Sequence, residues 1–105
     1  MIARVWKGRT RPEDADTYVD YVARTGLHDL RATPGNLGAW LLRARDGATV
    51  EFTVISLWES PASIAAFAGD DIDVARYYPE DPRYLLEMSK TVDHYEAFSQ
   101  ESLAG

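Results

Sequence analysis

The chain has 105 residues, a hydrophobic share of 46% and a charged share of 27%, which is typical of one soluble globular domain. Its formal net charge of −6 argues against binding to nucleic-acid phosphates or to anionic membranes, since both need basic patches. The chain has no cysteine, which excludes disulfides, thiolate catalysis and thiolate metal sites. The sequence shows no signal-peptide core and no membrane-length apolar run, so a cytoplasmic protein is the expectation.

The first predicted element is a strand over residues 2–8. Its alternation places Arg4 and Trp6 on one face of the strand. Thr10 followed by Glu13 then predicts a capping box at the start of a helix.

That helix is predicted to continue to about residue 32. Gly26 in its interior costs about 1 kcal/mol relative to Ala. It therefore indicates either close packing or a helix that ends early and restarts at Leu27. The apolar stripe has helical spacing and consists of Ala15, Tyr18, Val19, Val22, Gly26 and Leu30.

Two strands in a hairpin are expected next. A turn at residues 33–36 precedes a strand over residues 37–44, and residues 45–47 form the hairpin turn because Asp-Gly favours positive φ. Trp40 and Leu42 lie on one face of the first of these strands. The partner strand, at about residues 50–58, is apolar on both faces: Val50, Phe52, Val54 and Trp58 on one, Thr53, Ile55 and Leu57 on the other.

The partner strand turns sharply into a short helix. Ser60 is a good N-cap, Pro61 suits the first helical position, and Gly69 suits the end of the helix. Further short helices are expected over residues 72–78 and 81–86.

A last strand over residues 90–98 completes a β-α-β-β-α-β order, which predicts a ferredoxin-like α+β fold with a four-stranded antiparallel sheet. The domain is expected to span residues 1–98, with residues 99–105 as a tail.

The two apolar faces of the central strands predict a homodimer. Two helices cover only one face of such a sheet, and a soluble monomer rarely exposes an apolar patch as large as the other face. A two-fold dimer with sheet against sheet is the simplest closure. The alternative is a monomer in which residues 70–88 fold over the open face.

The chain resembles the antibiotic biosynthesis monooxygenase (ABM) family in the order of its elements and in the motif Leu57-Trp58-Glu59-Ser60, which precedes a short helix that contains Phe67. The resemblance covers residues 2–98 and implies a dimeric α+β barrel. Members of the family include cofactor-independent oxygenases of polycyclic aromatic phenols and heme-degrading monooxygenases.

The heme-degrading branch can be compared residue by residue. Those enzymes carry an Asn on the first strand, a second Trp after the Trp-x-Ser motif and, ten residues later, a His that ligates iron. The corresponding positions here hold Trp6, Phe67 and Tyr77. The comparison disfavours heme degradation, and it implies that these three residues line the ligand cavity as substrate-binding residues.

Two residues are candidates for catalysis. His94 can act as a general base near neutral pH, although a structural or interface histidine is the alternative. Arg4 shares a strand face with Trp6 and can hold a substrate oxyanion, the alternative being an internal salt bridge.

Other signals are weaker. His28 suits a solvated position near a helix C-terminus. Asp70, Asp71 and Asp73 fit no known metal-binding loop and are explained by N-capping, so no metal site is expected. No Ser/His/Asp triad, phosphate loop or dinucleotide fingerprint is present.

The sequence therefore leads to two hypotheses. The first is a monooxygenase-like enzyme of the ABM type that acts without a cofactor on a small aromatic or polyketide-like substrate. The second is a non-catalytic dimer that binds a small molecule, because this fold alone does not determine an activity.

Overall fold

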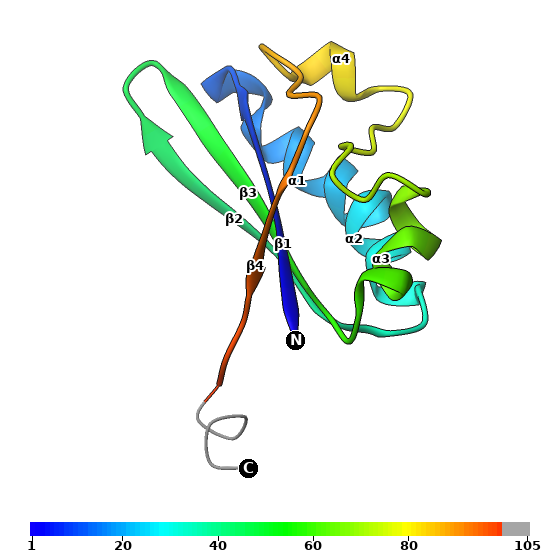
Figure 1. The fold of residues 1–105 in the computed structure, drawn as a ribbon. Coiled ribbons are helices and arrows are strands. Elements are labelled where there is room, and N and C mark those ends of the chain that lie inside the picture. The colour runs from blue at the N-terminus through cyan, green and yellow to red at the C-terminus, as the bar shows by residue number, and fades with distance from the viewer. Residues whose placement is uncertain (100–105) are drawn as a thin grey trace.

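The computed structural model describes residues 1–99, and the part of the predicted tail from residue 100 onward lies outside them. Four strands form one antiparallel sheet in the order β2-β3-β1-β4, and the helices cover one face of it (Figure 1). The predicted ferredoxin-like α+β fold is confirmed. The elements are β1 (Ile2–Thr10), the 3-10 turn η1 (Pro12–Asp14), α1 (Ala15–Arg24), α2 (Gly26–Ala32), β2 (Asn36–Asp46), β3 (Thr49–Trp58), α3 (Pro61–Ala68), α4 (Asp81–Tyr84) and β4 (Asp93–Glu96).

The strand register determines which side chains face the helices. Arg4 of β1 lies opposite Ser56 of β3 and opposite His94 of β4, and Ala39 of β2 lies opposite Ser56. Directly opposed residues of an antiparallel pair point to the same side of the sheet. These four residues thus form one row across the helix-facing side, next to the fully buried Trp58.

The first predicted helix is two helices. Thr25 interrupts the helix, because its backbone is not helical, with φ −108° and ψ −88°. Its hydroxyl donates to the Tyr21 carbonyl at 2.8 Å. Of the two interpretations of Gly26, the helix that ends early and restarts is therefore the one that forms, and α2 begins at Gly26 itself. The predicted capping box is wrong, because the Thr10 hydroxyl donates to the Arg11 carbonyl and a 3-10 turn follows. None of the helices in residues 1–99 is both long and apolar enough to span a membrane.

The turn into α3 forms as predicted. The Ser60 hydroxyl accepts from the backbone N–H of Ser63 at 3.2 Å, and Gly69 ends the helix with φ 95°. Gly35, with φ 88°, packs so closely against this helix start that a Cβ there would lie 2.1 Å from the Ser63 hydroxyl oxygen. A side chain at position 35 is thus excluded both by the backbone angle and by space.

The connection from α3 to β4 differs from the prediction. Residues 69–92, here called the covering segment, are largely irregular and pack on the helix side of the sheet (Figure 1). The helix expected over residues 72–78 does not form, because the backbone pairs across the segment: Ala75 N–H donates to Lys90 O, and Val92 N–H to Asp73 O, both at 2.9 Å. The same pairing keeps residues 90–92 out of the last strand, which begins at Asp93.

The other face of the sheet has no cover within residues 1–99. Trp40, Leu42 and Tyr95 lie on it with relative exposures of 48%, 49% and 56%. The covering segment lies on the opposite side, where Tyr77 contacts Trp6 and Tyr78 contacts Asp29. The alternative of a monomer closed by residues 70–88 over the open face is therefore wrong.

Candidate functional site

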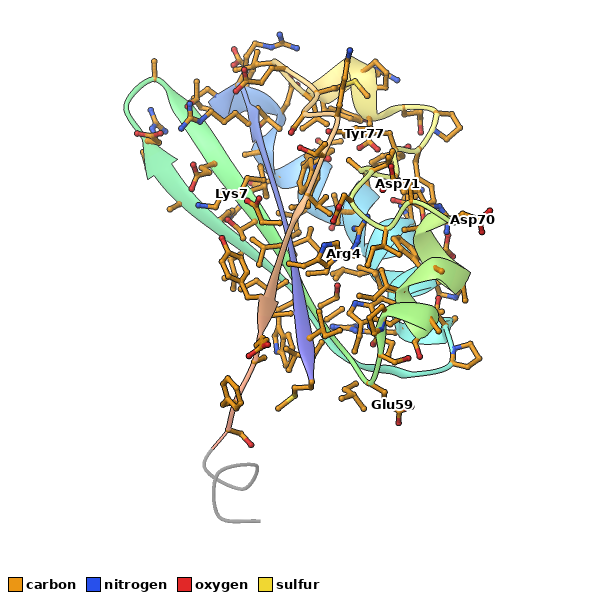
Figure 2. The ribbon with its side chains drawn as sticks, in the orientation of Figure 1. Arg4, Lys7, Glu59, Asp70, Asp71 and Tyr77 are labelled. Carbon is orange, nitrogen blue, oxygen red and sulfur yellow. The ribbon has the colours of Figure 1, made fainter. Side chains whose placement is uncertain are left out.

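A cavity of about 60 Å³, partly open to solvent, lies between the sheet and the helices beneath the covering segment. In Figure 2, Arg4 and Tyr77 extend into this layer, whereas Lys7 lies on the other side of the sheet. The wall is mostly apolar and aromatic, with a few polar groups. It is formed by Arg4, Trp6, Tyr18, Val22, Thr25, Gly26, Leu30, Val54, Ser56, Phe67, Arg76, Tyr77, Tyr78 and Asp81.

Four of the five predicted site residues meet on this wall. Arg4 and Trp6 come from β1, Phe67 from α3 and Tyr77 from the covering segment. His94 faces the same side of the sheet but is not among the residues that line the cavity. The predicted base therefore lies on β4, the strand next to β1, and outside the cavity wall.

Trp6 and Tyr77 connect the sheet to the covering segment. The indole N–H of Trp6 donates to the Tyr77 hydroxyl at 3.2 Å, and the two rings meet edge to face at 6.2 Å. Trp6 can lie flat along its strand because the residue two positions on is Gly8. A Cβ on Gly8 would lie 2.5 Å from the Trp6 ring.

Arg4 is a buried cation, 5% exposed. Its Nη2 donates to the Val74 carbonyl at 2.9 Å, and its guanidinium lies 5.6 Å from the centre of the Phe67 ring. Its Nε is buried and has no hydrogen-bond partner among residues 1–99. No carboxylate of these residues lies within 4.0 Å of it, so the alternative of an internal salt bridge is not formed.

The charge on Arg4 persists in spite of this burial. Desolvation lowers the pKa of the Arg4 guanidinium from its ordinary value of 12.5, and the negative charge of Asp73 opposes that shift. Arginine starts from so high a pKa that it stays protonated in proteins. The cavity therefore contains a permanent positive charge.

His94 forms a pair with Asp73. Its Nδ1 lies 2.9 Å from the Asp73 carboxylate, and its side chain is 15% exposed. An ionised carboxylate only accepts hydrogen bonds, so the shared proton belongs to Nδ1. In the neutral ring Nε2 then carries a lone pair, and this atom is buried without a partner among residues 1–99. The pair has the arrangement of a histidine base oriented by a carboxylate.

Several polar residues of the wall were not predicted from the sequence, among them Ser56 and Arg76. Ser56 is 1% exposed, and its hydroxyl accepts from the Trp58 indole N–H at 2.9 Å. Arg76 lies over the rings of Phe67 and Tyr78, with centroid distances of 4.7 and 5.1 Å. Ser56 could have been found from the sequence, because it is the one hydroxyl on the otherwise apolar side of β3 that faces the helices. Arg76 gave no such signal, because it comes from an irregular segment.

Asp81 joins the covering segment to α1. It is 5% exposed, and it accepts from the Tyr18 hydroxyl at 2.9 Å and from the Tyr78 backbone N–H at 2.7 Å. Desolvation raises the pKa of Asp81, although both hydrogen bonds oppose the rise. Desolvation, followed by the charge of Asp81, raises the pKa of Tyr18 far above its ordinary value. Tyr18 therefore stays a neutral donor.

A second anchor ties the covering segment to α2. Asp29 accepts from the Tyr78 hydroxyl at 2.6 Å and lies 3.4 Å from Arg76. The bond from Tyr78, and then that from His28, lowers the pKa of Asp29. His28 itself is 73% exposed in its side chain, as expected for a solvated histidine.

The acidic run at the start of the covering segment forms no metal site. Asp71 accepts from the Asp73 backbone N–H, and Asp73 orients His94. Residues 1–99 contain no group of three or more His, Asp or Glu side chains placed to hold a metal ion.

Comparison with known proteins identifies one family. The sequence profile of the family described as antibiotic biosynthesis monooxygenase (ABM) matches residues 1–72. No curated protein sequence matches the chain. The matched span contains β1 through α3, and thus the part of the cavity wall that the sheet provides.

Solved structures share the fold at low sequence identity. One, described as an antibiotic biosynthesis monooxygenase from Nitrosomonas europaea, has a TM-score of 0.67 and 14% identity and covers 94% of this chain and 100% of its own. Rv0793 of Mycobacterium tuberculosis has a TM-score of 0.60 and 16% identity, with coverage of 94% and 96%. The heme-degrader MhuD of the same organism, solved with two hemes bound, has a TM-score of 0.58 and 19% identity, with coverage of 95% and 98%. These likenesses show the fold alone.

Proposed function

Because the chain belongs to the antibiotic biosynthesis monooxygenase family, we propose that it is a monooxygenase-like protein that acts without a cofactor on a small aromatic or polyketide-like substrate. In this chemistry the deprotonated substrate itself reduces dioxygen. The protein removes the proton, orients the substrate and stabilises the charge that develops.

Each predicted residue has a role in this proposal. Trp6, Phe67 and Tyr77 form the aromatic wall against which a flat ring packs. Arg4 holds the negative charge of the substrate, and His94, with its lone pair on Nε2, accepts the proton. Arg4 and His94 are opposed across β1 and β4, so their backbones are about 5 Å apart.

The observation that carries the proposal is the Nε of Arg4, which is buried at the cavity wall and has no hydrogen-bond partner within residues 1–99. Leaving a charged donor buried without an acceptor costs free energy, and each such group in a native protein calls for an explanation. A bound ligand with an oxygen atom that accepts a hydrogen bond from the Arg4 Nε–H supplies this explanation.

The proposal is tested by oxygen uptake with anthrone- and quinol-type substrates. We expect the wild type to consume oxygen and His94→Gln to lose most of this activity while remaining folded. Glu96→Gln, an exposed change on the same strand, serves as the control. Absence of uptake above buffer with the whole panel, from folded protein, contradicts the enzyme proposal.

A non-catalytic binding protein is the second candidate, and one observation favours it: His94, the proposed base, does not line the cavity. For either candidate, the cavity volume of about 60 Å³ is smaller than the apolar cavity of about 150 Å³ that binds benzene. An aromatic ring must therefore protrude through the open side or displace the covering segment.

Heme does not fit this cavity well. Tyr77 holds the position of the iron-ligating histidine, but its hydroxyl already accepts from Trp6 and donates to the Ser89 carbonyl. The volume is also far below that of pockets that bury ligands of drug size, about 300–1,000 Å³. A heme titration without a saturable endpoint and a Soret shift is the expected result.

We also propose that the protein is a homodimer in which the open sheet faces pack against each other. The exposed Trp40, Leu42 and Tyr95 support this arrangement, as does the position of the covering segment on the opposite side. An isologous two-fold contact buries the same apolar face on both subunits.

A further inference from the structure

Arg4 and Ser56 place two hydrogen-bond donors at the same end of the cavity. They are directly opposed on β1 and β3, both line the cavity, and both are at least 95% buried. The Ser56 hydroxyl accepts from Trp58, and its own proton has no acceptor among residues 1–99. The Arg4 Nε–H likewise has none.

A second cation lies nearby on the same wall. The Arg76 guanidinium is 4.7 Å from the centre of the Phe67 ring, and the Arg4 guanidinium is 5.6 Å from that centre. Arg76 is 39% exposed in its side chain and partly compensated by Asp29, so its charge is screened more than that of Arg4. It adds positive potential at the solvent-exposed rim of the cavity.

The acidic groups near these donors are already engaged. Asp81 lines the cavity, but its two oxygens accept from Tyr18 and from the Tyr78 backbone. Asp73 pairs with His94. No carboxylate of the described residues contacts Arg4, although the charge of Asp73 acts on it from a greater distance.

We propose that the ligand enters this cavity as a carboxylate anion, with its carboxylate on the Arg4 Nε–H and the Ser56 hydroxyl and its aromatic ring against Trp6, Phe67 and Tyr77. This inference rests on the proposed function in taking the same cavity as the ligand site. It specifies that Arg4 holds a charge that the ligand carries permanently, rather than one that appears during the reaction.

A carboxylate fits the donors better than other anions do. Its two oxygens match one guanidinium N–H and one hydroxyl, and guanidinium–carboxylate hydrogen bonds are among the strong ones in proteins. A phosphate would bring more acceptor oxygens than the two donors that have no acceptor among residues 1–99 can satisfy. A phenol that is neutral when it binds would leave the buried cation without an anion in contact with it until deprotonation.

Paired ligands that differ only in charge test the inference. Benzoate and benzamide, and 1-naphthoate and 1-naphthamide, have nearly the same shapes, and their affinities for the full chain can be measured by calorimetry. We expect each carboxylate to bind at least about tenfold more tightly than its amide. Equal affinities within both pairs, or no saturable binding of any of the four, overturn the proposal.

Three variants locate the preference. Arg4→Met replaces a buried cation with an apolar side chain of similar length, a change that proteins often tolerate, and it is expected to abolish the preference. Ser56→Ala is expected to reduce it several-fold, and Arg83→Gln, on the exposed side of α4, should leave it intact. A preference that survives in a folded Arg4→Met protein contradicts the assignment.

The outcome is separable from that of the proposed function. Carboxylate-selective binding without oxygen uptake supports this inference and contradicts catalysis. Oxygen uptake with neutral phenols, without a preference for carboxylates, supports catalysis and contradicts this inference.

Discussion

The indole N–H of Trp6 donates to the hydroxyl of Tyr77, 71 residues away, and this bond connects the central strand β1 to the covering segment. The Tyr77 hydroxyl in turn donates a hydrogen bond to the Ser89 carbonyl at 2.5 Å. The Tyr77 side chain thus joins β1 to the covering segment at two places, residue 77 itself and Ser89. Asp81 and Tyr78 anchor the same segment to α1 and α2.

Tyr77→Phe removes this connection while keeping the ring. We expect a loss of about 1–3 kcal/mol in unfolding free energy, because the Trp6 N–H and the Ser89 carbonyl lose their partner. Faster amide hydrogen exchange over residues 86–92 should accompany it. Tyr84→Phe is the matched control, since no hydrogen bond of its hydroxyl is found among residues 1–99. Equal effects of the two changes contradict this role for Tyr77.

Gly8→Ala is predicted to disturb the cavity wall. The new Cβ would lie 2.5 Å from the Trp6 ring, so the ring must move. Overpacking of this kind costs about 1–3 kcal/mol. Denaturant unfolding measures the loss.

Gly26→Ala provides the contrast. Its Cβ would meet the Tyr78 ring at an ordinary 3.8 Å, and alanine favours the helix by up to about 1 kcal/mol. We therefore expect this variant to be at least as stable as the wild type. A Gly8→Ala protein that matches it in stability contradicts the packing described for Trp6.

The pKa of Asp29 predicts a specific dependence of stability on pH. The Tyr78 hydroxyl and His28 lower the pKa of Asp29 in the folded state from its ordinary value of 3.8. A group whose folded pKa is lowered contributes stability fully above its unfolded pKa and loses it as the pH falls through the folded value. Asp29→Asn should therefore destabilise the protein near pH 6 and by less as the pH falls below 3.8.

Asp20→Asn, an exposed change on α1 with no ion pair among residues 1–99, is the control for this experiment. Unfolding free energies measured across the acid range should show no comparable trend for it. Burial raises the pKa of Asp81, so this group changes the stability with pH in the opposite direction. Asp81 is present in the wild type and in the Asp29→Asn variant, so its effect cancels in their difference. A pH-independent difference between Asp29→Asn and wild type is inconsistent with the hydrogen bond from Tyr78.

Leu42→Glu tests the proposed dimer. Leu42 is 49% exposed on the open sheet face, where a charge would be buried without a partner in a sheet-to-sheet contact. Sedimentation should give twice the chain mass of 11.8 kDa for the wild type and the chain mass itself for the variant. Thr17→Glu adds the same charge on an exposed position of α1 and should remain dimeric. A wild type of 11.8 kDa at micromolar concentration contradicts the dimer.

The sequence predicted the fold because its local signals were strong. Alternation with a period of two placed Arg4 and Trp6 together, and Ser60 with Pro61 marked the start of α3. The face taken by His94 depends on the pairing of β4 with β1, which no local signal specifies.

The covering segment was the least predictable part of the chain. Its turn residues suggested capped helices. Its backbone instead forms hydrogen bonds between residues far apart in the sequence, such as Ala75 and Lys90, and local helix propensity does not predict such bonds. Tyr77 could be placed on the cavity wall only through a family resemblance. Arg76, which lies in the same segment, was missed for the same reason.

We propose that the oxygenase reaction takes place at the cavity that Arg4 lines. This is tested by turnover of an anthrone-type substrate under isotopically labelled dioxygen, followed by mass spectrometry of the product. We expect one labelled oxygen atom per product from the wild type and little product from His94→Gln. Product that carries oxygen from water, or equal labelling by both proteins at equal rates, contradicts it.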